Sequence, residues 1–222
     1  MRISTLFMAS VPLAVALLAA SQSPSVAGWA SQQNDPGLSI RVLSADIAKD
    51  GTIRARYRVT DGTGLPLDIA GSKTPGTIQM SHQAGYAPEG QTHFVSYSTS
   101  PAPQGRNAAT LGARDVGGKL EAAGRGEYVY TFRAKAPPGW NPAATHRIAV
   151  HGLRDLKPLG RAESVKYADT TFDFVPAGGT PKPPEIHRHC NSCHGATQAG
   201  PDGSPRSEQL CIMCHTQMKC AS

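Results

Sequence analysis

The chain has 222 residues and carries 22 lysines and arginines against 16 aspartates and glutamates, a formal net charge of +6 at pH 7. This excess is small and no run of basic residues accompanies it, so nucleic acid is not an expected partner. The 23 glycines and 18 prolines exceed what a helical protein usually contains and favour short strands joined by tight turns.

Residues 1–27 have the pattern of a secretory signal peptide. Arg2 supplies a positive start, residues 6–20 are apolar, and the Ser-Val-Ala sequence at 25–27 offers small residues to a signal peptidase. The apolar run is too short for a spanning helix. The sequence therefore predicts export to the periplasm or the cell surface. It does not predict an integral membrane protein, although association with the outer membrane is compatible with export.

Residues 28–175 are expected to form one β domain. Apolar and charged residues alternate strictly in 52–60 (TIRARYRVT), and the alternation recurs in 127–135 (EYVYTFRAK) and 145–153 (THRIAVHGL). A period of two with one charged face indicates a half-buried antiparallel strand. Weaker candidate strands lie at 38–47, 93–99 and 170–175.

Turn signals separate these segments. They are Asp-Gly at 50–51 and 61–62, and Pro-Pro-Gly at 137–139. Six or seven short strands with this punctuation predict a mainly β protein, with an immunoglobulin-like antiparallel β-sandwich. Residues 101–125, rich in Gly, Ala, Pro and Arg, are expected to form a long exposed loop.

The composition changes after the predicted sandwich. Residues 176–185 (PAGGTPKPPE) read as a Pro/Gly linker, and all five cysteines fall within 186–222. This C-terminal segment contains few apolar residues, so it is not expected to bury enough surface to fold alone. We therefore expect an irregular or short-helical segment whose core is supplied by disulfides, a metal or haem.

Two Cys-x-x-Cys-His motifs lie in this segment, CNSCH at 190–194 and CIMCH at 211–215. This spacing is that of c-type haem attachment. Two thiols add across the vinyl groups of one porphyrin edge, and the next histidine gives its imidazole to the iron. Two motifs therefore predict two covalently bound haem c groups. The expected attachment residues are Cys190, Cys193, Cys211 and Cys214, and the expected proximal iron ligands are His194 and His215.

The same four thiols also fit other chemistry. Their C-x2-C-x17-C-x2-C spacing lies within the range of a zinc ribbon, and a disulfide could close each pair. Neither scheme uses the histidine that follows both pairs, and zinc thiolates suit reducing compartments better than an exported protein. Haem is the favoured interpretation. The alternative is a β-sandwich that binds a partner and carries a zinc- or disulfide-stabilised tail.

Each haem iron also has a sixth position. His187 and His189 precede the first motif and could reach the second haem, whereas Met213 lies inside the second motif and is poorly placed. Met218 is a further candidate, although a lone methionine more often serves packing. Two imidazoles would keep the reduction potential low, while an open position would suit a haem sensor or enzyme. Four further histidines belong to the β domain: His82, His93, His146 and His151.

The chain resembles a known family in ARYRVTDGTGLPLD (55–68), FDFVPAGG (172–179), CNSCHG (190–195) and QLCIMCH (209–215). The resemblance is to the OmcA/MtrC family, the outer-membrane multihaem c-type cytochromes of metal-reducing bacteria. It implies that a β-sandwich precedes a haem-binding domain and that the protein transfers electrons in an extracellular or periplasmic respiratory chain. It also implies that the partners are other multihaem cytochromes or redox proteins.

Two departures from the family pattern define what is expected of this chain. It has two haem motifs where the family continues, so we expect a short dihaem relative or a truncated member. The family also commonly has a histidine between these two motifs that serves as a distal ligand. Here residues 195–210 contain no histidine, which leaves the distal ligand of at least one haem unassigned.

Overall fold

The structure is a computed structural model, and it describes residues 37–91, 93–101, 110–161, 164–184 and 206–214. The predicted signal peptide and the first Cys-x-x-Cys-His motif lie outside these residues.

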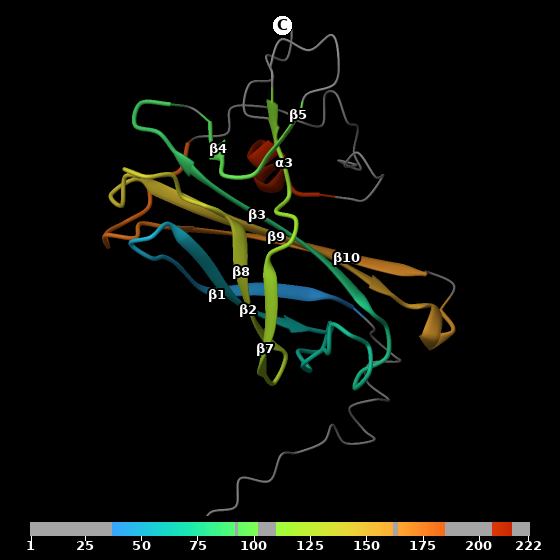
Figure 1. Cartoon of the computed structure of the whole chain (residues 1–222). Helices are drawn as coiled ribbons and strands as arrows, with labels where there is room; N and C mark the ends of the chain where they lie inside the picture. Colours follow the sequence, from blue (N-terminus) through green and yellow to red (C-terminus); the bar gives the residue numbers. More distant parts are fainter. Residues whose placement is uncertain (1–36, 92, 102–109, 162–163, 185–205, 215–222) are drawn as a thin grey trace, which may run out of the picture.

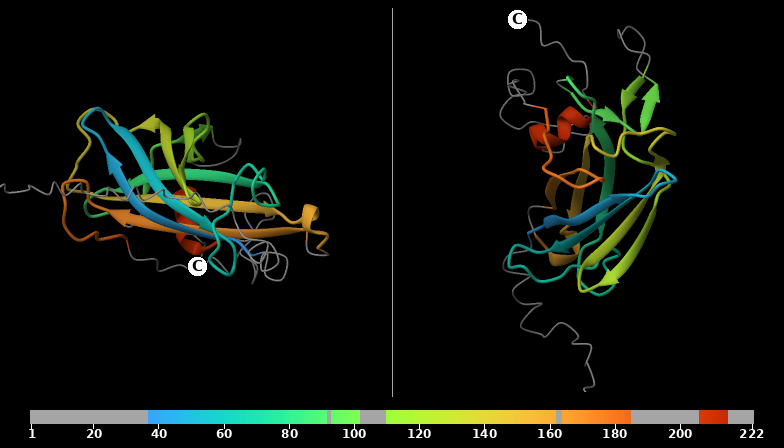
Figure 2. Two further views of the ribbon diagram at one scale, coloured as in Figure 1. Left: turned by 90° about the horizontal axis from the view of Figure 1, so that it is seen from below. Right: turned by 90° about the vertical axis from the view of Figure 1, so that its left-hand side faces the viewer.

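Two four-stranded antiparallel sheets pack face to face (Figures 1 and 2). Sheet I has the strand order β1-β2-β8-β7, sheet II has the order β10-β9-β3-β4, and β5 pairs with β6. The predicted mainly β, antiparallel sandwich is confirmed. The strands are β1 (Ser39–Ile47), β2 (Thr52–Thr60), β3 (Ile78–Ala87), β4 (Val95–Ser96), β5 (Thr99–Pro101), β6 (Thr110–Gly112), β7 (Lys119–Gly124), β8 (Glu127–Lys135), β9 (Thr145–Asp155) and β10 (Val165–Phe174); a 3-10 turn, η1 (Lys157–Leu159), joins the last two.

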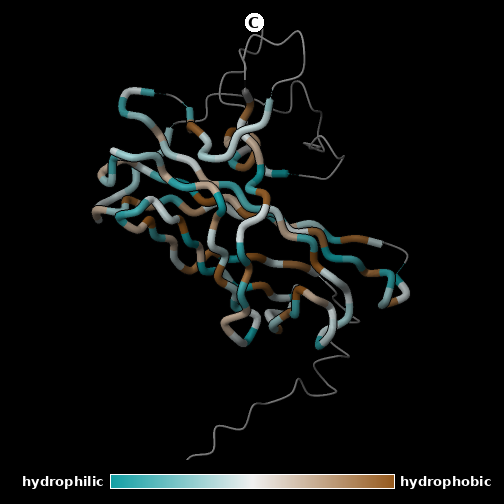
Figure 3. Tube along the Cα trace, viewed as in Figure 1, coloured by the Kyte–Doolittle hydropathy of each residue, from teal (hydrophilic) through white to brown (hydrophobic). Residues whose placement is uncertain are grey.

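The main core lies between the two sheets and follows the alternation predicted from the sequence. In β2, Ile53, Tyr57 and Val59 are fully buried, while the arginines between them are exposed. The hydropathy colours along the chain show the same alternation (Figure 3). Burial of these side chains is the main stabilising term of the fold, roughly 1.5–3 kcal/mol for each large apolar residue. Further core side chains come from β8 and β9: Tyr128, Tyr130, Phe132, Ile148 and Val150.

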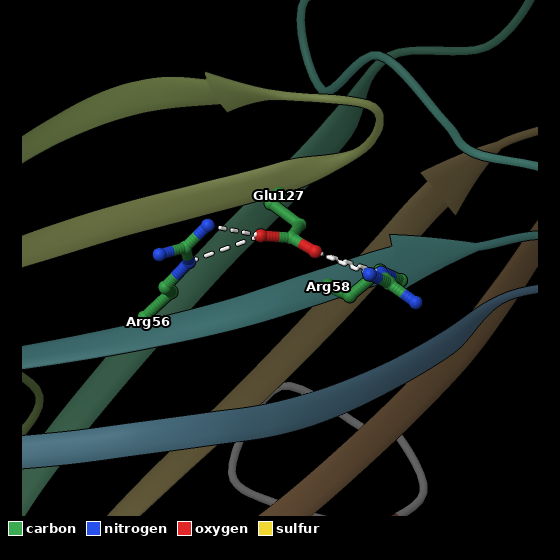
Figure 4. Close-up of polar contacts among 3 residues, drawn as sticks. All are labelled: Arg56, Arg58 and Glu127. Atoms are coloured by element: carbon green, nitrogen blue, oxygen red, sulfur yellow. Dashed lines mark hydrogen bonds and ion pairs between the residues drawn. The ribbon is translucent and has the colours of Figure 1, made fainter.

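The outer face of sheet I is charged. The carboxylate of Glu127 on β8 accepts a hydrogen bond from Nη2 of Arg56 at 2.6 Å. It also accepts hydrogen bonds from Nε and Nη2 of Arg58 (Figure 4). Both arginine side chains remain about half exposed, at 51% and 50%. Exposed ion pairs of this kind contribute at most about 1 kcal/mol, so the cluster aligns β2 with β8 rather than dominating stability.

Two parts of the sandwich differ from the sequence prediction. Residues 101–125 are not one long loop, because β6 and β7 lie within them, and β7 pairs with β8 as an edge strand. All six residues of β7 are exposed, so no alternation marks the strand. The sequence pattern also does not predict β3. Its consecutive buried residues His82 to Gly85 belong to a strand covered on both faces, which hides the period of two.

Candidate haem-binding segment

One short helix carries the start of the second Cys-x-x-Cys-His motif. Residues Glu208–Cys214 form α3, which lies on the face of sheet II that points away from sheet I (Figure 2). Cys211 and Cys214 are three positions apart on this helix, and such positions share one helix face. This spacing fits two thioether bonds to one porphyrin edge. The expectation of a short-helical C-terminal segment is confirmed for these residues.

Two apolar side chains of α3 are buried against the sandwich. Leu210 is 3% exposed and Met213 is 0% exposed, and they form a second apolar cluster with Ala87, Phe94 and Ala149. The prediction that a disulfide, metal or haem must supply the core of the C-terminal segment is wrong for α3. The outer face of sheet II supplies it, through residues more than 60 positions away in the sequence.

The surface beneath α3 is built from aligned residues on three strands. Gly85 of β3, Arg147 of β9 and Asp173 of β10 pair in register. A Cβ at Gly85 would lie 2.6 Å from the carbonyl oxygen of Val95 and 3.2 Å from Cε of Met213. Glycine at this position therefore allows both α3 and β4 to approach β3 closely.

Arg147 is the polar centre of this contact, and its residue is only 3% exposed. Its Nε and Nη2 donate to the carboxylate of Asp173 at 2.6 and 2.8 Å. Its Nη1 donates to Oε1 of Gln209 on α3 at 2.7 Å, and the guanidinium lies 4.3 Å from the ring centroid of Phe94. One buried cation thus contacts β10, α3 and the segment before β4.

The beginning of α3 is tied to β10. The backbone N–H of Ser207 donates to Oδ2 of Asp169 at 2.6 Å. The N–H groups of Leu210 and Cys211 both donate to the carbonyl of Ser207 at 3.1 Å. The helix is therefore held by a hydrogen bond at its first turn and by Arg147 and Met213 further along.

His82 lies in the core between the sheets, away from α3. Its Nε2 forms a 2.9 Å hydrogen bond with the hydroxyl of Tyr57, and its ring stacks on Tyr130 with centroids 3.6 Å apart. Burial lowers the pKa of His82 to about 3, although the charge of Asp115 acts in the opposite direction. Burial also raises the pKa of Tyr57. Both groups are uncharged at neutral pH and serve the core.

His146 also has both ring nitrogens engaged. Its Nε2 donates to the carbonyl of Asn141 at 3.1 Å, and its Nδ1 accepts from the hydroxyl of Tyr97 at 2.9 Å. Burial lowers the pKa of His146. His151 has a different place, since it is buried on the outer face of sheet II, paired in register with Asp169. His93 is half-buried in the loop before β4.

The structure therefore describes part of the predicted site. Cys211 is half-buried on α3, and α3 ends at Cys214. Within residues 37–184 and 206–214, gaps excepted, no three His, Cys, Asp or Glu side chains gather as metal ligands, and no helix is long and apolar enough to span a bilayer. The number of haems and their iron ligands remain predictions. The predicted site residues outside the described ranges are Cys190, Cys193, His194, His215, His187 and His189.

The fold resembles parts of two solved structures. The crystal structure of the outer membrane decaheme cytochrome OmcA matches with a TM-score of 0.51 and 16% identity, over 81% of this chain and 29% of that chain. The structure of MtrC from Shewanella baltica OS185 matches with a TM-score of 0.50 and 20% identity, over 80% of this chain and 29% of that chain.

These likenesses establish a shared fold. The chain spans less than a third of the length of either structure. No protein-family model matches the chain, and no curated protein matches it.

Proposed function

We propose that the protein is an exported dihaem c-type cytochrome that transfers electrons in a periplasmic or extracellular respiratory chain. The observation that carries the proposal is the second Cys-x-x-Cys-His motif, whose two cysteine positions share one face of a helix docked on the sandwich. The sandwich shares its fold with decahaem cytochromes, and this likeness supports the same role here. We propose further that the chain is a short relative of those proteins.

The chain's own residues would attach and orient the cofactor. Cys190 and Cys193 would bond one haem, and Cys211 and Cys214 the other, with His194 and His215 as proximal ligands. Haem c supplies one-electron redox chemistry when it is bound, and the protein's part is to hold and tune it. The proposed partners are other multihaem cytochromes or redox proteins, with which the haems would exchange electrons.

Haem counting tests this proposal. The full chain with its leader is expressed in a host that attaches haem c, and haem per chain is measured by pyridine haemochrome spectra and intact mass. We expect two haems. The double variants Cys190→Ala/Cys193→Ala and Cys211→Ala/Cys214→Ala should each retain one. Cys220→Ala, which lies outside both motifs, is the matched control and should retain two.

One haem or none in the wild-type chain would refute the dihaem proposal. Bound zinc without a Soret band would instead support the partner-binding module with a metal-stabilised tail. The spectrum also distinguishes a carrier from a sensor or enzyme. A low-spin six-coordinate iron that carbon monoxide does not perturb is expected for an electron carrier, whereas a Soret shift with carbon monoxide indicates an open iron position.

A further inference from the structure

We propose that the outer face of sheet II is a docking surface that orders the helical part of the second attachment motif, residues 211–214, before haem is bonded, with Arg147 as its positioning residue. The occupant is this chain's own α3. The proposal rests on the proposed function only in naming the motif a haem-attachment motif, because the contacts themselves involve the polypeptide alone.

A helix of this length needs such a surface. α3 has seven residues, and isolated helices shorter than about 12 residues are marginal in water. Leu210 and Met213 lie three positions apart and form one apolar stripe, and both are buried against Phe94 and Ala149. Met213 belongs to the motif itself, between the two cysteines. One of the two variable positions of the motif therefore helps to hold α3 against the sandwich.

The burial of Arg147 shows that the sheet surface is adapted to the helix. Arginines on the outer face of sheet I, such as Arg56 and Arg58, remain half exposed (Figure 4). Arg147 is also on an outer face, yet it is almost fully covered. Its charge is paired with Asp173, and its remaining guanidinium nitrogen points to Gln209 of α3. A buried charge satisfied in this way favours one arrangement of the helix over others.

The docking also sets where the cysteines lie. Successive residues of an α-helix are turned by about 100° around its axis, so position 211 is rotated from the sheet-facing position 210. Position 211 consequently lies to one side of the apolar stripe, and Cys211 remains half-buried rather than fully covered by the sheet. Docking through Leu210 and Met213 therefore fixes the direction in which the second motif presents its attachment face relative to the sandwich.

Hydrogen exchange measured by mass spectrometry tests the proposal on the full chain, both haem-loaded and haem-free with reduced thiols. In the haem-free wild type we expect the amides of residues 210–213 to exchange at least about tenfold more slowly than unstructured peptide amides. Met213→Ala and Arg147→Met should remove this protection and leave the amides of β2 and β8 protected. Arg147→Lys, which keeps the charge but loses the fork to Asp173, should give an intermediate rate.

Arg133→Met is the matched control, because Arg133 is an exposed arginine on β8 of sheet I, and it should leave exchange in α3 unchanged. Unprotected α3 amides in the haem-free wild type would overturn the proposal, as would unchanged protection in both Met213→Ala and Arg147→Met. Haem counting separates the two proposals. Protected α3 in a chain that binds no haem would refute the function alone, whereas two haems with an unprotected haem-free α3 would refute the docking alone.

Discussion

Individual residues of sheet II take their roles from the face on which they lie. His82 and Arg147 are both buried ionisable residues on neighbouring strands. His82 faces the core between the sheets, where it bonds to the hydroxyl of Tyr57 and burial lowers its pKa more than the charge of Asp115 raises it. Arg147 faces outward, where Asp173 and α3 pair and cover its charge. The two faces of sheet II thus bury ionisable side chains in two ways, His82 beside a neutral hydroxyl and Arg147 beside a carboxylate.

The buried ring of His82 predicts a loss of stability in mild acid. Its pKa is depressed from 6.5 to about 3 in the folded state, so the unfolded chain takes up the proton first as the pH falls. The contribution of His82 to the free energy of unfolding is therefore fully present above pH 6.5 and is lost as the pH falls from 6.5 to 3. At pH 5 this single group should cost about 2 kcal/mol relative to pH 7. Urea unfolding of the wild type and His82→Gln at both pH values measures the difference.

His82→Gln should lose less stability between pH 7 and pH 5 than the wild type, by about the same 2 kcal/mol. Some dependence will remain, because burial lowers the pKa of His146 as well. His93→Gln is the control, since His93 lies half-buried in a loop. Equal pH dependence in the wild type and His82→Gln would contradict the prediction.

At the scale of elements, one carboxylate joins the segment before β7 to β8. Asp115 accepts hydrogen bonds from the hydroxyl of Tyr130 and the N–H groups of Arg133 and Ala134, each at 2.9 Å. Its own N–H donates to the carbonyl of His82 at 2.7 Å, which connects the same segment to β3 in the other sheet. This arrangement positions an edge strand that has no buried side chains of its own.

Asp115→Ala should therefore lower the free energy of unfolding by about 3–5 kcal/mol, because several donors lose their acceptor and each unsatisfied buried donor costs about 1–3 kcal/mol. Urea denaturation at pH 7 measures the loss. Glu121→Ala on β7 is the control and should cost less than about 1 kcal/mol, because its ion pair with Lys119 is exposed. A loss below about 1 kcal/mol for Asp115→Ala would show that β7 is held by its backbone pairing with β8 alone.

At the scale of the whole molecule, the residues that the structure describes form two apolar clusters of unequal size. The larger lies between the sheets and draws on both of them. The smaller lies on the outer face of sheet II and includes α3. The smaller cluster joins α3 to residues of the sandwich, whereas the larger cluster contains no residue of α3. We therefore expect α3 to need the sandwich in order to fold, and the sandwich to fold without α3.

Deletion of residues 186–222 should consequently leave a sandwich that unfolds cooperatively. We expect a stability loss of about 1–4 kcal/mol, because Phe94, Ala149 and Arg147 lose the cover of α3 while the main core is unchanged. Near-ultraviolet circular dichroism and urea unfolding of the shortened chain provide the measurement. A shortened chain without a cooperative transition would show that the tail is part of the main core.

Elements whose physical signal is local could be predicted from the amino-acid sequence. Alternation in 52–60 and 127–135 predicted β2 and β8 with their boundaries, since a half-buried strand must repeat with a period of two. The two Cys-x-x-Cys-His motifs likewise carry the haem prediction in five adjacent residues each.

Elements that depend on contacts between distant parts of the chain could be recognised only in the folded structure. β3 and β7 lack alternation because one is covered on both faces and the other on neither. The docking of α3 depends on Gly85, Phe94 and Arg147, which lie far from Met213 in the sequence. No local pattern marks such contacts, because a surface that receives a helix exists only after three strands have been brought into register.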